Sequence, residues 1–167
     1  QETWQQLKSA DGVLVPGAFG HRGTEGKILS IKHARENKVP YLGICLGMQL
    51  MCIEYLRQTL DDPQITSQEF DEFGELSKDK YAIHFLPGQH LDKNKGGTLR
   101  LGSYPCKLTL GTKTHQIYEQ NTIQERHRHR YEFNNKFRQD LESNGYLISG
   151  IYEEEDLVEI VENTEHP

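Results

Sequence analysis

Two short apolar runs, each followed by apolar positions at helical spacing, open the sequence. DGVLVPG at residues 11–17 and YLGI at residues 41–44 have the length and composition of buried strands. Thr24 can cap a helix over residues 24–37, and a second helix is predicted over residues 46–60, where leucine and isoleucine recur at helical spacing. Strands alternating with helices through short loops predict a parallel sheet covered by helices.

The second half of the sequence has shorter patterns. Residues 61–80 are acidic and polar, which favours a surface excursion, and YAIHFLPG at 81–88 is a candidate strand. LDKNKGG at 91–97 is typical of a mobile loop, and residues 98–111 predict two short antiparallel strands around Gly-Ser-Tyr-Pro. The other expected elements are one or two helical turns at 115–121, a strand at 125–133, an Asn-capped helix at 134–145, and paired strands at 146–152 and 157–162.

These elements predict one α/β domain over residues 1–167, with a mostly parallel central sheet, flanking helices and a small antiparallel portion. Apolar residues make up 35% and charged residues 26%, which supports a core inside a heavily solvated surface. The net charge of -6, from 25 acidic and 19 basic residues, argues against a dedicated nucleic-acid binder.

The composition also bears on location and metal binding. No apolar run is long enough to span a membrane, and QETWQQLKSADG has neither the basic nor the apolar part of a signal peptide. Three cysteines, an odd and sparse set, indicate a reduced and cytoplasmic protein. Because there is no Cys-x-x-Cys motif and no zinc-ligand spacing, no metal site is expected.

GICLG at residues 43–47 is the motif that carries candidate chemistry. Gly-x-Cys-x-Gly between a strand and a helix is typical of a nucleophile elbow, in which larger residues two positions either side would collide. The turn would place Cys45 at the positive end of a helix, which favours a thiolate, and the N–H of Leu46 could donate to an oxyanion. A buried core cysteine is the alternative, and it is the stronger interpretation for Cys52 and Cys106.

Several longer stretches resemble one family. PYLGICLGMQL at 40–50, with VLVPGAFGHRGTEGKI at 13–28 before it, is similar to class I glutamine amidotransferase domains, which have a flavodoxin-like fold. GTEGKI at 23–28, GGTLRLG at 96–102 and ERHRHRYEFN at 125–134 resemble the CTP synthase family in particular. They occur in that family's order, and the resemblance covers nearly the whole chain.

The resemblance implies the glutaminase domain of a CTP synthase. Such a domain hydrolyses L-glutamine through a cysteine thioester and supplies ammonia for the ATP-dependent amination of UTP to CTP. The amination would take place in an N-terminal synthase domain of the same polypeptide, in an enzyme that forms homotetramers. The resemblance implies no cofactor in this domain; ATP, Mg²⁺ and the activator GTP would serve the full-length enzyme.

The resemblance also implies a set of site residues. Cys45 matches the nucleophile, and Glu69 matches the carboxylate that holds the α-amino group of glutamine. Arg130, the last arginine of RHRHR, matches another position that contacts glutamine. The positions implied for glutamine binding are Ala18, Leu46, Gly47, Met48, Gln49, Glu69 and Arg130.

Two departures from the family pattern stand out. The family usually has Pro-Gly-Gly-Phe-Gly where residues 16–20 are Pro-Gly-Ala-Phe-Gly. Ala18 keeps the N–H that would be the second oxyanion donor, but alanine disfavours a positive φ. The family's catalytic His-Pro-Glu is expected beyond Pro167, so His166 is not expected to be the base. The domain is therefore expected to lack its first strand and its C-terminal His-Pro-Glu segment.

Alternatives remain for the basic residues and for the function. Alternation along RHRHR predicts arginines on one face of a strand and His127 and His129 on the other; for Arg126 and Arg128 a solvated strand is the alternative. Arg100, in a glycine-rich stretch, is a hypothetical lid or GTP-coupled residue. The chain could also be a non-catalytic or regulatory relative that binds an amino acid or a partner, or another cysteine hydrolase with the same elbow.

Overall fold

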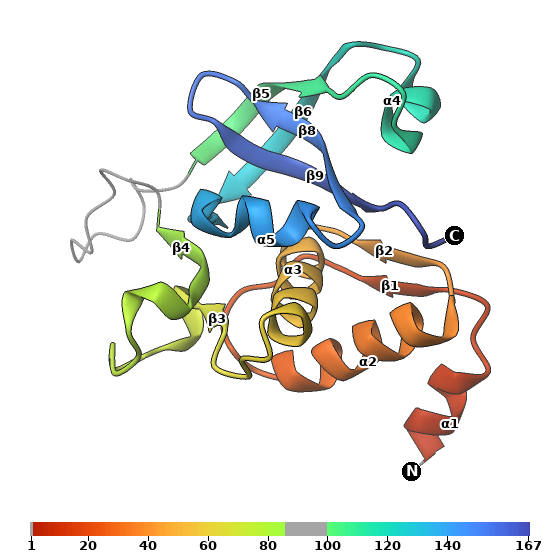
Figure 1. Ribbon diagram of the computed structural model, residues 1–167, viewed down its shortest axis with the longest axis vertical. Coiled ribbons are helices and arrows are strands. Elements are labelled where there is room, and N and C mark those ends of the chain that lie inside the picture. The colour runs from red at the N-terminus through yellow and green to blue at the C-terminus, as the bar shows by residue number, and fades with distance from the viewer. Residues whose placement is uncertain (1, 86–99) are drawn as a thin grey trace.

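The computed structural model describes residues 2–85 and 100–167, and the first half forms the predicted strand-helix units (Figure 1). β1 (Val13–Val15) and β2 (Tyr41–Gly43) pair in parallel, with Leu14 opposite Leu42. α2 (Thr24–Asn37) connects them, and α3 (Leu46–Thr59) follows β2. The order of these elements is the one that their apolar patterns predict.

Within the described residues, seven further strands form two more sheets. β3 (Thr66–Ser67), β4 (Tyr81–Phe85) and β7 (Tyr131–Phe133) form a three-stranded sheet, in which β3 and β4 are parallel and β7 is antiparallel to β4. The four-stranded sheet is antiparallel throughout. Its order is β6 (Thr122–His129), β5 (Arg100–Leu108), β8 (Tyr146–Tyr152) and β9 (Leu157–Asn163).

The α/β class is confirmed, and the antiparallel portion is larger than the sequence pattern indicates because β5, β6, β8 and β9 pair with one another. The other helices in the described part of the chain are α1 (Glu2–Lys8), α4 (Lys113–Tyr118) and α5 (Arg138–Glu142), with 3₁₀ turns at Gln68–Phe70, Lys78–Lys80 and Asn135–Phe137.

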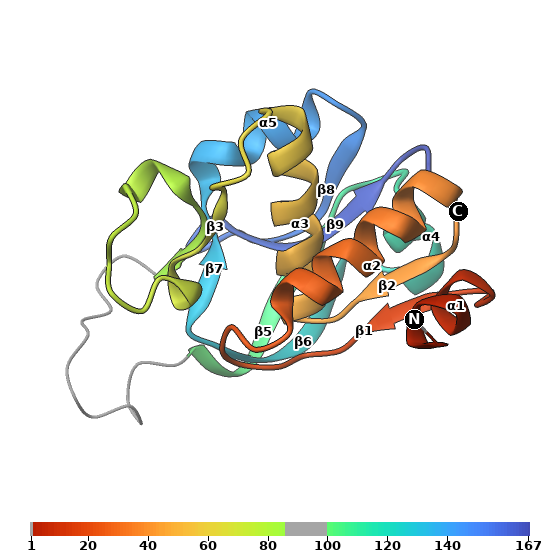
Figure 2. The same cartoon turned by 90° about the horizontal axis from the view of Figure 1, so that it is seen from below.

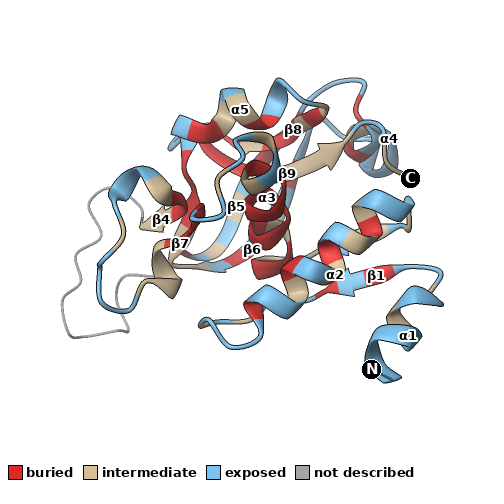
Figure 3. Ribbon diagram, turned by 60° about the horizontal axis from the view of Figure 1, so that its bottom comes forward, coloured by how far each residue is buried: buried red, intermediate tan, exposed pale blue. Residues whose placement is uncertain are grey.

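The α3 helix is the centre of the core. It contacts α2, β1, β2, β4 and α5, and Figures 1 and 2 place it between the β1–β2 pair and the strands of the second half. Leu50, Ile53 and Leu56 are 0% exposed, and Figure 3 shows α3 as the most continuously buried helix. A helix that is apolar on nearly every side must be covered on every side, which fixes its N-terminus inside the molecule.

Two local expectations differ from the structure, and a third is confirmed. Gly23, with φ 73°, is the N-cap of α2, while Thr24 is its first residue and donates its hydroxyl to the carbonyl of His21. The strand expected over 125–133 is interrupted at Arg130, which separates β6 from β7. The Asn134 cap is confirmed, since its side chain accepts from the N–H of Lys136.

The prediction of two short strands over residues 98–111 is wrong. Residues 100–108 form one strand, β5, that runs through Pro105. Pro105 pairs with Gln124 of β6, whereas β8 pairs with β5 only at Lys107 and Leu108. Pro105 therefore lies where β5 has a neighbour on one side only, a position at which a missing N–H is tolerated. The loop expected at 91–97 lies outside the described residues.

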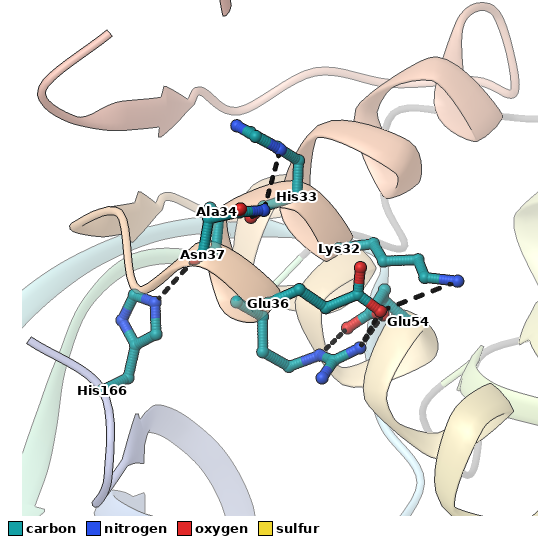
Figure 4. Close-up of polar contacts among 8 residues, drawn as sticks. Lys32, His33, Ala34, Glu36, Asn37, Glu54 and His166 are labelled. Atoms are coloured by element: carbon teal, nitrogen blue, oxygen red, sulfur yellow. Dashed lines mark hydrogen bonds and ion pairs between the residues drawn. The ribbon is translucent and has the colours of Figure 1, made fainter. Parts of the chain in front are cut away.

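A buried ion pair joins α2 to α3. Arg35 donates from Nε and Nη2 to the two carboxylate oxygens of Glu54, both at 2.9 Å, and the Glu54 side chain is 4% exposed. Figure 4 labels Glu54 on α3 and, on the facing helix α2, Lys32 and Glu36, which lie beside this ion pair. Removing one partner leaves the other charge buried and uncompensated.

We expect Arg35→Ala to lower the free energy of unfolding by about 3 kcal/mol, because it leaves the Glu54 carboxylate buried without its cationic partner. Urea unfolding of the variant and the native protein measures this difference. Lys32→Ala on the same helix is the matched control, since its pair with Glu36 is 3.8 Å long and solvent-exposed and contributes at most about 0.5 kcal/mol. Equal stability of the two variants would contradict the argument.

Candidate active site

Cys45 occupies a strained turn between β2 and α3. Its φ of 55° and ψ of -109° lie outside the regions that non-glycine residues ordinarily adopt. The two flanking glycines are required by sterics. A Cβ on Gly43 would lie 2.6 Å from the carbonyl carbon of Gly47, and a Cβ on Gly47 would collide with the carbonyl oxygen of Val15. The geometry is that of a nucleophile elbow, as GICLG predicts.

The turn packs against the loop that follows β1. A Cβ on Gly17 would lie 3.3 Å from the Cβ of Cys45, so the loop approaches the cysteine closely. Ala18, the next residue, packs against the core and is not among the residues with positive φ. Alanine therefore occupies this position without the backbone strain that a left-handed conformation would impose.

Glu69 holds the far end of the same loop. The N–H of Gly20 donates to Oε1 of Glu69 at 2.7 Å, and Glu69 itself lies in the 3₁₀ turn after β3, where its N–H donates to Ser67. A residue 49 positions away along the chain thus fixes the loop beside Cys45.

Gln49 and Tyr131 connect α3 to the strand after Arg130. The Gln49 amide donates to the carbonyl of Tyr131 at 2.9 Å, and the Gln49 side chain is buried. Burial raises the pKa of Tyr131, the charge of Glu69 raises it further, and the charge of Arg130 lowers it. Glu69 and Arg130, of opposite charge, therefore lie within electrostatic reach of one tyrosine.

The first turn of α3 supplies backbone donors next to the cysteine. N–H groups in the first turn of a helix have no carbonyl partner one turn earlier in the helix. Two of the N–H groups in this turn are already engaged: that of Gly47 donates to the carbonyl of Ile44 at 2.9 Å, and that of Gln49 to the carbonyl of Cys45 at 3.1 Å. Leu46 is buried as the first residue of α3, and Met48 is partly buried against the core.

A cavity of about 400 Å³ opens beside Cys45. Elements from both halves of the chain form its walls, which brings the elbow next to β6 and β9. Its lining includes Cys45, Met48, Glu125, Arg126, His127, His129 and Glu159. Mixed apolar walls with a few convergent polar groups are typical of small-molecule sites.

His129 is one of several residues lining this cavity that the motif analysis does not assign to the site. Burial lowers its pKa, but hydrogen bonding to Cys45 and to Glu132 outweighs burial and raises the pKa of His129 to about 10. Nδ1 of His129 lies 3.4 Å from Oε1 of Glu132, whose side chain is 3% exposed. The alternation of RHRHR predicts that His127, His129 and Tyr131 share one face. Within β6 this is confirmed, since His127 is buried and His129 half-buried beside exposed Arg126 and Arg128, and Tyr131 lies in the next strand, β7.

Arg100 is a buried structural cation, so its proposed role as a mobile lid residue is wrong. Its side chain is 3% exposed, with Nε 3.1 Å from Glu132 and Nη2 2.6 Å from Glu159. The guanidinium also lies over the ring of Tyr104, 4.8 Å from its centroid. A side chain so deeply buried and held by two carboxylates cannot close over a substrate, while its predicted coupling to GTP stays a prediction.

The other two cysteines are core residues, as expected. Cys52 on α3 and Cys106 on β5 are 0% exposed, and burial raises the pKa of each thiol to about 12. At neutral pH both stay protonated and apolar, so neither competes with Cys45 as a nucleophile.

His166 lies apart from the cavity beside Cys45. Its Nε2 is 3.0 Å from the carbonyl oxygen of Ala34, and Figure 4 shows the ring directed at the end of α2. The backbone carbonyl of His166 accepts from Nζ of Lys113 at 2.6 Å. His166 is not among the residues lining the cavity, which agrees with leaving it unassigned as a base.

The described ranges, residues 2–85 and 100–167, hold neither a metal cluster nor a membrane-spanning helix. Within these ranges there is no group of at least three His, Cys, Asp or Glu side chains that could hold a metal ion. None of the helices in the same ranges combines the length and apolar character needed to cross a bilayer.

Comparison with known proteins connects this geometry to one family. The family model for class-I glutamine amidotransferases matches residues 1–167. The chain is 52% identical over 161 residues to a CTP synthase of Caldanaerobacter subterraneus subsp. tengcongensis, and 52% identical over 161 residues to a CTP synthase of Bacillus licheniformis. Each match covers 96% of this chain and 29% of the relative, so the chain spans less than a third of their length.

A solved structure has a similar fold. The glutaminase domain of the Trypanosoma brucei CTP synthase, solved with bound acivicin, matches with a TM-score of 0.86 and 32% sequence identity. The match covers 99% of this chain and 62% of that one.

Proposed function

This chain belongs to the class-I glutamine amidotransferase family, and on that premise we propose that it is the glutaminase domain of a CTP synthase. The observation that carries the proposal is the conformation of Cys45, which is strained, flanked by two sterically required glycines and set at the start of a buried helix. Strain of this kind persists where the surrounding structure enforces it, and it is common at catalytic sites.

In the proposed reaction, Sγ of Cys45 attacks the side-chain amide carbon of L-glutamine. The C–N bond then breaks, the nitrogen takes up a proton and leaves as ammonia, and a γ-glutamyl thioester remains. Water adds to the thioester, the C–S bond breaks, and glutamate departs with the thiol restored. The N–H groups of Leu46 and Ala18 donate to the oxygen that becomes negative in each tetrahedral intermediate.

Glutamine recognition is assigned to the groups that converge near Tyr131. The carboxylate of Glu69 accepts from the substrate ammonium, and the guanidinium of Arg130 pairs with the substrate carboxylate. Gly47, Met48 and Gln49 line the first turn of α3 beside the amide. The Gly20 to Glu69 hydrogen bond supports this assignment, because it holds the acidic group and the loop with Ala18 in one arrangement.

The wider activity is proposed for the complete protein. Ammonia released here passes to an N-terminal synthase domain of the same polypeptide, where ATP and Mg²⁺ support the amination of UTP to CTP and GTP activates. A histidine of a His-Pro-Glu motif outside the present residues serves as the base. We assign the assembly to a homotetramer, by analogy with the CTP synthase family.

We expect Glu69→Gln to raise the KM for glutamine by about 10- to 100-fold with a smaller change in kcat, because it removes a charge that contacts the substrate ammonium. The amide keeps an oxygen that can accept from Gly20, so the loop stays in place. Steady-state glutaminase assays measure both constants, and Glu75→Gln in the same acidic excursion is the matched control. An unchanged KM would remove Glu69 from the binding site.

A further inference from the structure

The β3 strand ends directly before Glu69, and a side chain takes over from its backbone there. β3 ends at Ser67 and the chain turns into the 3₁₀ turn Gln68–Phe70, whereas the parallel neighbour β4 continues to Phe85. The N–H of Phe85 donates to Oε1 of Gln68 at 3.0 Å. Gln68 therefore supplies from its side chain the acceptor that a longer β3 would supply from its backbone.

The register of β4 and β7, which lie side by side in Figure 3, explains why Phe85 needs this acceptor. Asn134 donates its N–H to the carbonyl of Ala82 at 2.8 Å, which makes these two residues a hydrogen-bonded pair. Hydrogen-bonded and non-hydrogen-bonded pairs alternate along an antiparallel ladder, so Phe85 and Tyr131 form a non-hydrogen-bonded pair. Their backbone groups point away from each other and need partners outside the ladder.

A second glutamine meets the other residue of this pair. The carbonyl of Tyr131 accepts from Nε2 of Gln49 at 2.9 Å, and the Gln49 side chain is buried. The two charged residues assigned to the substrate are the chain neighbours of this arrangement, because Glu69 follows Gln68 and Arg130 precedes Tyr131. The two side-chain amides thus fix the backbone beside each charge.

We propose that Gln68 is a positioning residue for glutamine recognition, which sets the separation between the Glu69 carboxylate and the Arg130 guanidinium by holding its turn against the end of β4. The inference deepens the proposed function and rests on its assignment of these two charges to the substrate. A fixed separation favours ligands that carry an ammonium and a carboxylate on one carbon, which are α-amino acids. Gln68 acts through its neighbours and is not a catalytic residue.

The contacts of the turn support this role. Oγ of Ser67 accepts from the N–H of Glu69 at 3.2 Å, and Oε1 of Glu69 accepts from the N–H of Gly20 at 2.7 Å. These two bonds hold Glu69 to β3 and to the loop beside Cys45, but neither joins it to β4 or β7. The bond from Phe85 to Gln68 makes that connection. Without it, the turn can shift relative to the strand that follows Arg130.

The test is steady-state glutaminase kinetics of Gln68→Leu in the complete protein, with L-glutamine and with glutaramate, the analogue that lacks the α-amino group. Leucine removes the acceptor, and we expect the KM for glutamine to rise by about 5- to 50-fold with kcat changed by less than about threefold. The kcat/KM for glutaramate should change by less than about threefold, since glutaramate has no ammonium for Glu69 to bind. A native KM for glutamine in Gln68→Leu would overturn the inference.

A double-mutant cycle separates positioning from general damage. Glu69→Gln already removes the charge that Gln68 positions, so adding Gln68→Leu should raise the KM by no more than about twofold further. Two residues that affect binding independently would instead give multiplied effects on the KM. Such multiplied effects would contradict the proposed route through Glu69.

Two further variants serve as controls. Gln68→Glu keeps an oxygen that can accept from Phe85, so its preference for glutamine over glutaramate should stay within about threefold of the native value. A loss as large as that of Gln68→Leu would count against the role of the acceptor. Gln64→Leu is the matched control, because Gln64 is exposed in the same segment and its kinetic constants should be native.

A measurement on the native protein covers the case in which Gln68→Leu does not fold, as judged by circular dichroism. Exchange of the Phe85 amide with solvent should be at least about 100-fold slower than that of an unprotected amide. An unprotected Phe85 amide would refute the inference. A native protein that does not hydrolyse glutamine would instead count against the proposed function, so the two failures are distinguishable.

Discussion

Replacing Cys45 with alanine should abolish glutamine-dependent CTP synthesis while leaving synthesis from added ammonia intact. Without the thiol no thioester can form, and we expect the glutamine-dependent rate to fall by about 10³-fold or more. The backbone strain at residue 45, with φ 55°, is independent of the sulfur, so the substitution tests chemistry more than folding. Parallel assays with glutamine and with ammonium chloride measure the two rates.

The matched control is Cys52→Ala, which removes a thiol from the same helix at a fully buried position. It should lower stability modestly, as for other small core truncations, and leave both nitrogen sources in use. Equal losses of the glutamine- and ammonia-dependent rates in Cys45→Ala would contradict the role assigned to the elbow. Retained glutamine-dependent synthesis would contradict it more directly.

The second large effect is expected for Gly47→Ala. The new methyl group would collide with the carbonyl of Val15 on β1, which is backbone and cannot rotate away. We expect the free energy of unfolding to fall by about 3 kcal/mol, at the upper end for overpacking. A displacement of α3 by about 1 Å would also cost about 100-fold in glutaminase rate.

Gly26→Ala is the control for this substitution. Gly26 lies in α2, where an added Cβ meets no atom within 4 Å. Because alanine favours helix more than glycine does, this variant should be more stable by about 0.5–1 kcal/mol and fully active. Urea unfolding and glutaminase assays on both variants measure the difference. Gly47→Ala with native stability and rate would show that the close approach to β1 is not required.

The sequence predicts the elbow because its signals are local. The apolar run at 41–44, the helical spacing after Leu46 and the two glycines around Cys45 all lie within about 20 residues, so the motif can be read from one short segment. Local signals of the same kind predict α2 and the paired strands β8 and β9. The fold class followed from the order of these elements.

The network around His129 could not be predicted in this way. Arg100, Glu132 and Glu159 come from β5, β7 and β9, and their spacing in the sequence does not predict that they are in contact. The alternation of RHRHR predicts which side chains point inward, but the partners depend on strand pairing, such as that of Arg100 with His129. Arg100 was misjudged for this reason, because the glycines around it indicate a loop while its tertiary contacts bury it.

The prediction of two strands around Pro105, where the structure has the single strand β5, is wrong for a related reason. Proline inside an apolar run usually separates two strands. It can lie within one strand where that strand is paired on one side only, because the missing N–H is then not needed. The partial overlap of β5 with β8, limited to Lys107 and Leu108, leaves Pro105 on such an edge. The pattern within residues 98–111 does not contain this information, which depends on where β8 ends.

The most direct test of the account is covalent trapping of Cys45 by acivicin, a glutamine-analogue electrophile, in the complete protein. Peptide mass spectrometry would locate the adduct, with Cys45→Ala as the control. We predict one adduct, on Cys45, whose formation is blocked by excess glutamine. A folded protein that forms no adduct, or one whose adduct lies on another residue or ignores glutamine, would contradict the assignment of Cys45 as a glutaminase nucleophile.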